Sequence, residues 1–207
     1  MSDAVAVIRL GLKDAWEDLW TVLVCNLIWL LSVLLIIPGP PATLALFYYT
    51  NRLAHGEVAD LADFWQALRR YFAPAWRWGL INLVLVAILV GDMLLTGRLG
   101  RSSLAYLIQS FYLAVLGVWL IVQLYTLSFL IEQDQPGVVQ AIRNGAVMLG
   151  QNIGFSISLG LLLAIVLLLG TLLFMLSFAV GGFLLASVGN HAVLNRLAAQ
   201  PVALQEK

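Results

Sequence analysis

Charged residues are scarce in this sequence of 207 residues. Asp, Glu, Lys and Arg together make up 11% of it, against about 25% in soluble domains, and the formal net charge is zero. No run of like charge occurs, so the basic face that nucleic-acid binding requires is missing. We therefore expect no nucleic-acid partner.

Residues that bind metals or act in catalysis are also few. The single cysteine, Cys25, cannot form a disulfide within the chain, and the two histidines, His55 and His191, have no metal-ligand spacing around them. The sequence contains neither a phosphate-binding glycine motif nor the Gly-x-Ser-x-Gly motif of serine hydrolases. We therefore expect no enzyme activity, no catalytic or metal-binding residues and no cofactor.

Hydrophobic residues are in excess. They make up 62% of the sequence, against roughly 45 to 50% in soluble proteins, and the mean hydropathy is +0.96. Since a helix needs about 20 apolar residues to cross a bilayer, the apolar windows predict a single all-α membrane domain over residues 1–207, with about six transmembrane helices in three hairpins. The expected spans are 16–37, 41–55, 77–96, 103–131, 153–174 and 178–197. The last two divide one apolar stretch that is too long for a single span, with the turn expected within 174–182.

The basic residues predict the orientation of these spans, because Lys and Arg are enriched on the cytoplasmic side near span ends. With both termini in the cytoplasm, nine basic residues lie inside, and Arg98 and Arg101 lie outside. The nine are Arg9, Lys13, Arg52, Arg69, Arg70, Arg77, Arg143, Arg196 and Lys207.

A structural turn is expected after the first span, at Pro38, Gly39, Pro40 and Pro41. Because proline has no N–H and forces the preceding residue into an extended conformation, the first span should end before Pro38. Pro41 can then be the first helical residue of the second span. We expect this turn at the outer surface of the bilayer.

Two amphipathic segments, residues 60–72 and 134–149, follow the second and fourth spans. Each has apolar residues at helical spacing with polar residues opposite, which is typical of a helix at a membrane surface. At an offset of 74 residues, Gln66-Ala67-Leu68-Arg69 matches Gln140-Ala141-Ile142-Arg143, and the predicted cap Asp60 falls on Asp134.

These matches suggest repeat units at 3–56, 60–132 and 134–200, each an inner-surface helix followed by a membrane hairpin. Ile8-Arg9 supplies a weaker third copy of the surface helix, and Asn51-Arg52 matches Asn195-Arg196. The alternative is that the segments are alike by chance, or because any helix at a cytoplasmic interface needs basic residues opposite an apolar stripe.

Polar side chains inside predicted spans are costly in a bilayer, and we single out Asn26, Asn82, Asp92, Gln109 and Gln123. Four of them, all but Gln109, form the candidate polar site inside the membrane. Asp92 could bind a cation or a proton, or form an ion pair with Arg98 or Arg101 at the outer interface. The amides could line a polar path between hairpins or hydrogen-bond neighbouring helices, and we favour the hydrogen bonds.

Three stretches carry a resemblance to a known family. They are NLIWLLSVLLIIPGPPATLALFYYTNRLAHGE at 26–57, ADFWQALRRYF at 62–72 and NHAVLNRL at 190–197. These stretches resemble the YesL-like family of bacterial integral membrane proteins, whose function is unknown, although the doubled proline at Pro40-Pro41 departs from the family pattern. The resemblance implies a multi-pass protein of the bacterial cell membrane, of a kind often associated with genes for sugar uptake and polysaccharide breakdown, and it implies no functional residues.

Two functions remain open. In the first, the protein is an accessory or scaffold protein linked to carbohydrate uptake, in which Arg69, Arg70 and Arg143 dock a membrane transport complex or a second copy, or hold anionic lipid. In the second, it is a small-solute transporter with a site formed by Asn26, Asn82, Asp92 and Gln123. One acidic residue away from the bilayer centre is weak support for transport, so we favour the scaffold.

Overall fold

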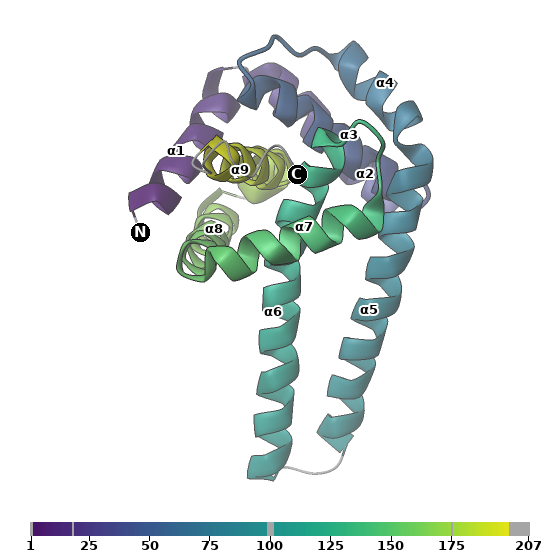
Figure 1. Ribbon diagram of the computed structural model, residues 1–207, viewed down its shortest axis with the longest axis vertical. Coiled ribbons are helices and arrows are strands. Elements are labelled where there is room, and N and C mark those ends of the chain that lie inside the picture. Colours follow the sequence, from purple (N-terminus) through teal and green to yellow (C-terminus); the bar gives the residue numbers. More distant parts are fainter. Residues whose placement is uncertain (1, 18, 99–101, 175, 199–207) are drawn as a thin grey trace.

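The computed structural model describes residues 2–17, 19–98, 102–174 and 176–198, with the backbone alone for Ser2, 172–174 and 176–179. All regular secondary structure in these residues is α-helical, which confirms the predicted class. The helices are α1 (Ser2–Glu17), α2 (Leu19–Leu34), α3 (Gly39–Ala54), α4 (Leu61–Arg70), α5 (Phe72–Arg98), α6 (Ser103–Glu132), α7 (Val138–Gln151), α8 (Ile153–Phe174) and α9 (Leu176–Ala198). Figure 1 shows a body of packed helices from which α5 and α6 project side by side as a long hairpin.

The hairpin of α5 and α6 is long enough to cross a bilayer. The two helices have 27 and 30 residues, or about 40 and 45 Å, against about 30 Å of hydrocarbon. Among the described residues, α5, α6 and residues 153–171 of α8 could each span a membrane, and α1 with α2 would be a fourth span if this bent pair counted as one.

Three candidate spans are fewer than the six expected from the sequence. The predicted spans 16–37 and 41–55 correspond to α2 and α3, which have 16 residues each and reach only about 24 Å. The predicted span 178–197 falls within α9. Of the segment 174–182 predicted to hold the turn before it, Phe174 ends α8 and residues 176–182 are helical in α9, while Met175 is outside the described residues.

The helix of the first predicted span ends before Pro38, as predicted, because α2 ends at Leu34. The turn occupies residues 35–38, however, and not the predicted Pro38, Gly39, Pro40 and Pro41, of which only Pro38 belongs to it. The start of the next helix differs from the prediction: Gly39, not Pro41, is the first residue of α3, and Pro40 and Pro41 follow it. The first N–H groups of a helix have no acceptor within the helix, so two prolines fit there without loss of a hydrogen bond. Ile36 in the turn has φ of 65°, a strained backbone conformation for a β-branched residue.

The predicted cap is present on α4 but absent from α7. Asp60 accepts a hydrogen bond from the Asp63 N–H at 3.0 Å, and Asp63 accepts one from the Asp60 N–H at 3.0 Å, which is a capping box. The cap residue of α7 is Gly137, and it makes no side-chain cap hydrogen bond. The prediction that Asp134 caps this helix is therefore wrong, and α7 begins at Val138 instead of residue 134.

The amphipathic helices α1, α4 and α7 bury part of their apolar stripe inside the protein, not against lipid. The buried positions are equivalent in the three segments: Ala4, Val7 and Gly11; Phe64, Ala67 and Tyr71; and Val138, Ala141 and Gly145. Glycine at the third position lets a helix approach its neighbour closely. A Cβ would lie 2.9 Å from Val188 at Gly11, and 3.0 Å from the Val122 carbonyl oxygen at Gly145.

The contacts between helices recur three times around a closed ring. The last helices of the three hairpins, α3, α6 and α9, contact one another at the centre. One amphipathic helix packs on each of them: α4 on α3, α7 on α6, and α1 on α9, so the first and the last helix lie against each other (Figure 1). The division of the sequence into units 3–56, 60–132 and 134–200 stays a prediction, which these equivalent contacts support.

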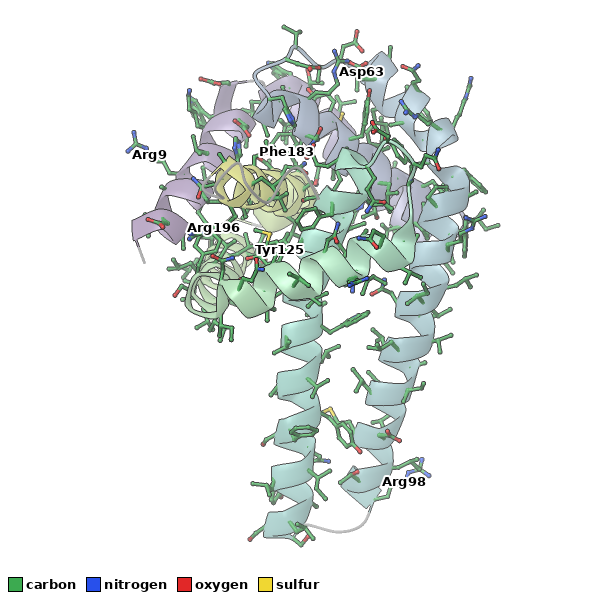
Figure 2. All side chains as sticks on the ribbon, viewed as in Figure 1. Arg9, Asp63, Arg98, Tyr125, Phe183 and Arg196 are labelled. Carbon is green, nitrogen blue, oxygen red and sulfur yellow. The ribbon has the colours of Figure 1, made fainter. Side chains whose placement is uncertain are left out.

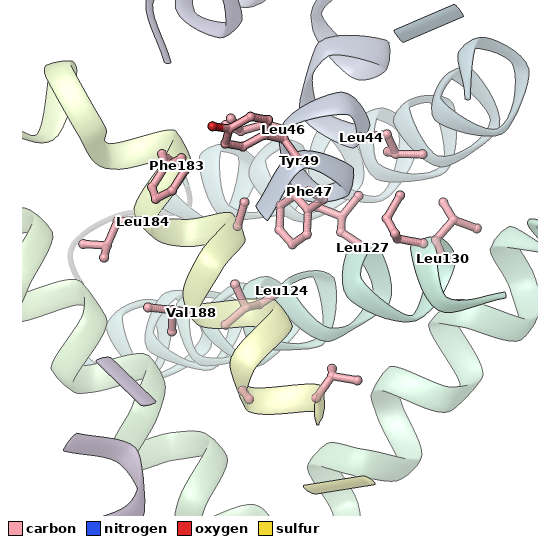
Figure 3. Packing of buried hydrophobic residues seen from close by; sticks show 14 of the residues in the cluster. Leu44, Leu46, Phe47, Tyr49, Leu124, Leu127, Leu130, Phe183, Leu184 and Val188 are labelled. Carbon is pink, nitrogen blue, oxygen red and sulfur yellow. The ribbon is translucent and has the colours of Figure 1, made fainter. Parts of the chain in front are cut away.

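The centre of the ring is an apolar core. Figure 3 shows Phe47 and Tyr49 of α3, Leu124 and Leu127 of α6, and Phe183 of α9 gathered there. All five side chains are buried, and the rings of Tyr49 and Phe183 meet edge to face with their centroids 6.2 Å apart. This core holds the three hairpins together at one end.

Replacing Gly182 of α9 by alanine should lower stability. A Cβ there would lie 2.5 Å from the Trp29 ring of α2 and 2.9 Å from Asn26 Oδ1, so the helices must move apart. We expect Gly182→Ala to cost about 1 to 3 kcal/mol, measured as the shift of thermal unfolding in detergent. Gly91→Ala is the control, since no atom lies within 4 Å of its Cβ position. Equal unfolding temperatures for the two variants would contradict the packing of α2 on α9.

Candidate functional site

A cluster of hydrogen-bonded side chains lies between α5 and α6, on the part of the hairpin that joins the body. Trp78 Nε1 donates to Gln123 Oε1 at 2.7 Å, and Asn82 Nδ2 donates to the same oxygen at 3.2 Å. Trp119 Nε1 donates to Asn82 Oδ1 at 2.9 Å. Gln123 is 6% exposed, and its buried Nε2 has no hydrogen-bond partner among the described residues. The structure therefore brings together two of the four predicted polar residues, Asn82 and Gln123.

The other two predicted polar residues lie elsewhere. Asn26 of α2 is fully buried, and its Oδ1 accepts a hydrogen bond from the Phe183 N–H of α9 at 3.0 Å. Asp92 lies about 15 Å beyond Asn82 along α5, half-buried. No ion pair joins it to Arg98, and Arg101 is outside the described residues. The four residues thus do not converge on one site.

The three arginines predicted to dock a partner are exposed. Arg69 and Arg70 belong to α4 and Arg143 to α7, and within the described chain they form no ion pair. The Arg70 guanidinium lies 5.5 Å from the centre of the Tyr71 ring. Their charges are therefore available to a partner.

Arg9 of α1 is a fourth arginine of this kind, which the sequence prediction of docking residues omitted. It stands between the second and third buried positions of its helix, as Arg69 and Arg143 do, and is exposed. Figure 2 shows its side chain extending away from the body. The Ile-Arg pair shared by Ile8-Arg9 and Ile142-Arg143 was the signal for it.

Two further arginines form ion pairs between neighbouring helices of the ring. Arg52 at the end of α3 forms an ion pair with Asp63 of α4. Arg196 at the end of α9 pairs with Asp3 of α1 at 3.2 Å, and its guanidinium lies 3.8 Å from the centre of the Phe155 ring. The sequence match between Asn51-Arg52 and Asn195-Arg196 indicated these arginines, but not their partners, because Asp3 lies at the other end of the chain.

Asp14 of α1, missed by the sequence analysis, forms a second link to α9. Its Oδ2 lies 2.7 Å from His191 Nε2 and accepts a hydrogen bond from Ser187 Oγ at 2.6 Å. Burial of the carboxyl raises the pKa of Asp14, but the hydrogen bonds from His191 and Ser187 and the nearby positive charges outweigh it and lower this pKa below its ordinary value. Ser187 is bonded to the carboxylate and not to the histidine, so the arrangement differs from a nucleophile–base–acid triad. It acts as a clasp between α1 and α9.

Two cavities are among those that open on the surface of the described residues. One, of about 270 Å³, lies between α2, α8 and α9 and is lined by Trp29, Leu167 and Gly182 among others. The second, of about 480 Å³, lies beside Arg77 of α5 and the first turn of α7. The lining of both is mainly apolar, and neither includes the cluster around Asn82. No group of three or more metal-binding side chains occurs within the part of the chain that the structure describes.

These observations define an all-helical protein with helices apolar enough to cross a membrane. Comparison with known families adds one match: residues 22–93, about one third of the chain, match the family described as "Protein of unknown function, DUF624". The matched segment covers α3, α4, most of α2 and most of α5. No curated protein and no solved structure matches the chain.

Replacing Asn82 by leucine should weaken the contact of α5 with α6. The change removes the acceptor of Trp119 Nε1 and one donor to Gln123, and we expect a loss of about 1 kcal/mol, since hydrogen bonds between membrane helices have this order of magnitude. Thermal unfolding in detergent, followed by tryptophan fluorescence, measures it. Asp92→Asn on the same helix should change stability by less than about 0.5 kcal/mol. A larger effect of Asp92→Asn than of Asn82→Leu would show that the cluster is not the stabilising contact.

The clasp at Asp14 predicts a dependence of stability on pH. A carboxyl with a lowered folded pKa stabilises the fold above its unfolded pKa, and this contribution is lost as the pH falls through the folded pKa. Between about pH 5 and pH 3 the unfolding temperature of Asp14→Asn should therefore fall less steeply than that of the unchanged protein. Parallel pH profiles of the two proteins would contradict the clasp.

Proposed function

We propose that this chain is a multi-pass protein of the bacterial cell membrane that acts as an accessory or scaffold protein. The hairpin of α5 and α6 crosses the bilayer, and both termini lie in the cytoplasm. On the cytoplasmic face, α1, α4 and α7 dock an acidic surface of a partner protein through Arg9, Arg69, Arg70 and Arg143.

The observation that carries this proposal is the distribution of charge along the molecule. Figure 2 shows Arg98 at the far end of the α5–α6 hairpin, while Arg9, Asp63 and Arg196 lie on the body. Between these ends the hairpin carries a single charged side chain beyond Arg77, that of Asp92. An apolar hairpin with charge at both ends suits a bilayer, and the richer basic end suits the cytoplasmic side.

The internal hydrogen bonds favour a scaffold over a transporter. Asn26 is bonded to α9, and Asn82 is bonded to two neighbours on α6, so both amides link helices and are not free to bind a solute. Exposed arginines without ion pairs, in contrast, lose no internal contact when they bind a partner. Their equivalent placement on three helices gives the docking face several points of contact.

A transporter remains the second candidate because of Gln123. Its buried Nε2 is a donor without a partner among the described residues, and a solute with an oxygen acceptor could satisfy it. Asp92, further along the same hairpin, forms no ion pair with any described residue. The proposed link to carbohydrate uptake rests on the resemblance to the YesL-like family alone. Because of that resemblance, sugars are the first solutes to test, and sugar-uptake complexes are the first partners to test.

Reversal of charge tests the docking face. Arg69→Glu combined with Arg70→Glu should reduce recovery of a co-purifying membrane complex by about tenfold or more, since two surface pairs of up to about 1 kcal/mol each turn from attraction to repulsion. Cross-linking in native membranes followed by purification in mild detergent measures this recovery. Arg98→Glu, an exposed arginine at the other end of the hairpin, should leave it unchanged.

Uptake assays separate the two candidates. If sugar uptake falls with Asp92→Asn or Gln123→Leu while the double arginine variant retains all its partners, the protein is a transporter and the docking proposal is wrong. Binding of the arginine variants to vesicles that contain phosphatidylglycerol distinguishes an anionic lipid surface from a protein partner.

A further inference from the structure

The turn between α2 and α3 presents an apolar tip. Its residues Leu34, Leu35, Ile36 and Ile37 are each between 66 and 71% exposed. Pro38 follows them, and no charged or polar side chain occurs from Val33 to Pro38. Four large apolar side chains in succession, all exposed, are unfavourable in water.

The backbone of this tip leaves no N–H group without an acceptor. The N–H groups of Leu35, Ile36 and Ile37 donate to carbonyl oxygens of Leu31, Val33 and Leu35 at 3.1, 3.1 and 2.7 Å. The N–H groups of Gly39 and Ala42 donate to Ile36 and Pro38 at 3.1 and 2.9 Å. The three remaining residues, Pro38, Pro40 and Pro41, have no N–H. Such a turn is suited to hydrocarbon, where an unpaired backbone donor costs several kcal/mol.

The hairpin of α2 and α3 is too short to reach the far side of a bilayer. Asn51 Nδ2 donates to Glu132 Oε1 at 2.6 Å, which holds the ends of α3 and α6 at the same level. The start of α3 lies beside α5, since a Cβ at Gly79 would be 3.0 Å from Pro40 Cγ. From Gly79 to Arg98, α5 continues through 19 residues, about 28 Å, so the tip of the shorter hairpin stops near the cytoplasmic end of the span and far from its outer end.

The tip of the long hairpin has the opposite character. Arg98 at the end of α5 is exposed, and Ser102 caps α6 by accepting a hydrogen bond from the Ala105 N–H at 3.2 Å. A charged side chain and an exposed polar cap suit water. The two tips thus differ both in their distance from the body of the protein and in the polarity of their side chains.

We propose that α2 and α3 form a re-entrant hairpin, which enters the bilayer from the cytoplasmic side and ends among the lipid acyl chains with Leu34–Ile37 at its tip. The inference rests on the proposed function in one respect, that α5 and α6 cross the same bilayer. It replaces the outer-surface position expected for Pro38 from the sequence. The strained φ of Ile36 is the conformational cost of a turn that satisfies its own N–H groups.

Single cysteines test this position. In a Cys25→Ala background, Ile36→Cys, Ser103→Cys and Gln66→Cys place one thiol at the short tip, at the long tip and on α4. A membrane-impermeant maleimide is added to intact cells and, separately, to inverted membrane vesicles. We expect Ser103→Cys to react with the maleimide in intact cells and Gln66→Cys to react in inverted vesicles. Ile36→Cys should react in neither preparation, and should react after denaturation in SDS.

Each other outcome has a definite meaning. Labelling of Ile36→Cys in intact cells places the tip at the outer surface, and labelling in inverted vesicles places it in the cytoplasm, so either result overturns the re-entrant hairpin. Absence of labelling of Ser103→Cys from outside refutes the crossing of α5 and α6, and with it the proposed function. Leu35→Cys repeats the test at the neighbouring residue and guards against misfolding of one variant.

Discussion

The packing of α3, α6 and α9 at the centre of the ring is the constraint on which the other contacts depend. Asn190 of α9 donates hydrogen bonds to the Phe47 carbonyl oxygen at 2.9 Å and to Thr50 Oγ1 at 2.8 Å, both on α3. One residue earlier, Gly189 brings α9 against α6, where a Cβ would lie 3.1 Å from the Leu124 carbonyl oxygen. Burial of polar side chains is costly unless they are bonded, so these contacts fix which helices meet and at what level.

The contact between the last helix of a hairpin and an amphipathic helix occurs three times around this centre, with different side chains each time. Arg52 with Asp63 and Arg196 with Asp3 are ion pairs that tie the end of a hairpin to the next amphipathic helix. Between α6 and α7 the place of the ion pair is taken by Gln133, whose Oε1 accepts a hydrogen bond from the Gly137 N–H at 2.7 Å. Between α9 and α1 there is a second link, the contact of Asp14 with His191.

The three hairpins leave this common base with unequal lengths. Between α5 and α6 the polar side chains Trp78, Asn82, Trp119 and Gln123 bond one another, so the long hairpin is held by specific contacts close to the body. Further out, most side chains of the hairpin are apolar, and Gln109 Nε2 donates a hydrogen bond to the Met93 carbonyl oxygen at 3.4 Å. Arg9, Arg69, Arg70 and Arg143 lie exposed on helices whose inner face is already buried, so binding of the proposed partner at these arginines requires no rearrangement of the core.

Composition and hydrophobic period were sufficient to predict the helical class, the amphipathic helices and the positions of α5, α6 and α8, because these features depend on residues that are near one another in the chain. Helix lengths were predicted less well: the apolar run through Leu34–Ile37 extends the hydrophobic window past the end of α2, and only the tertiary structure shows that the chain turns there. The separation of Asn26, Asn82 and Asp92 into different environments was equally out of reach, since all three look alike as polar residues in apolar windows. Contacts such as Asp3 with Arg196 depend on how distant helices pack, and no local pattern encodes them, whereas the tertiary structure decides them through the shape of the core.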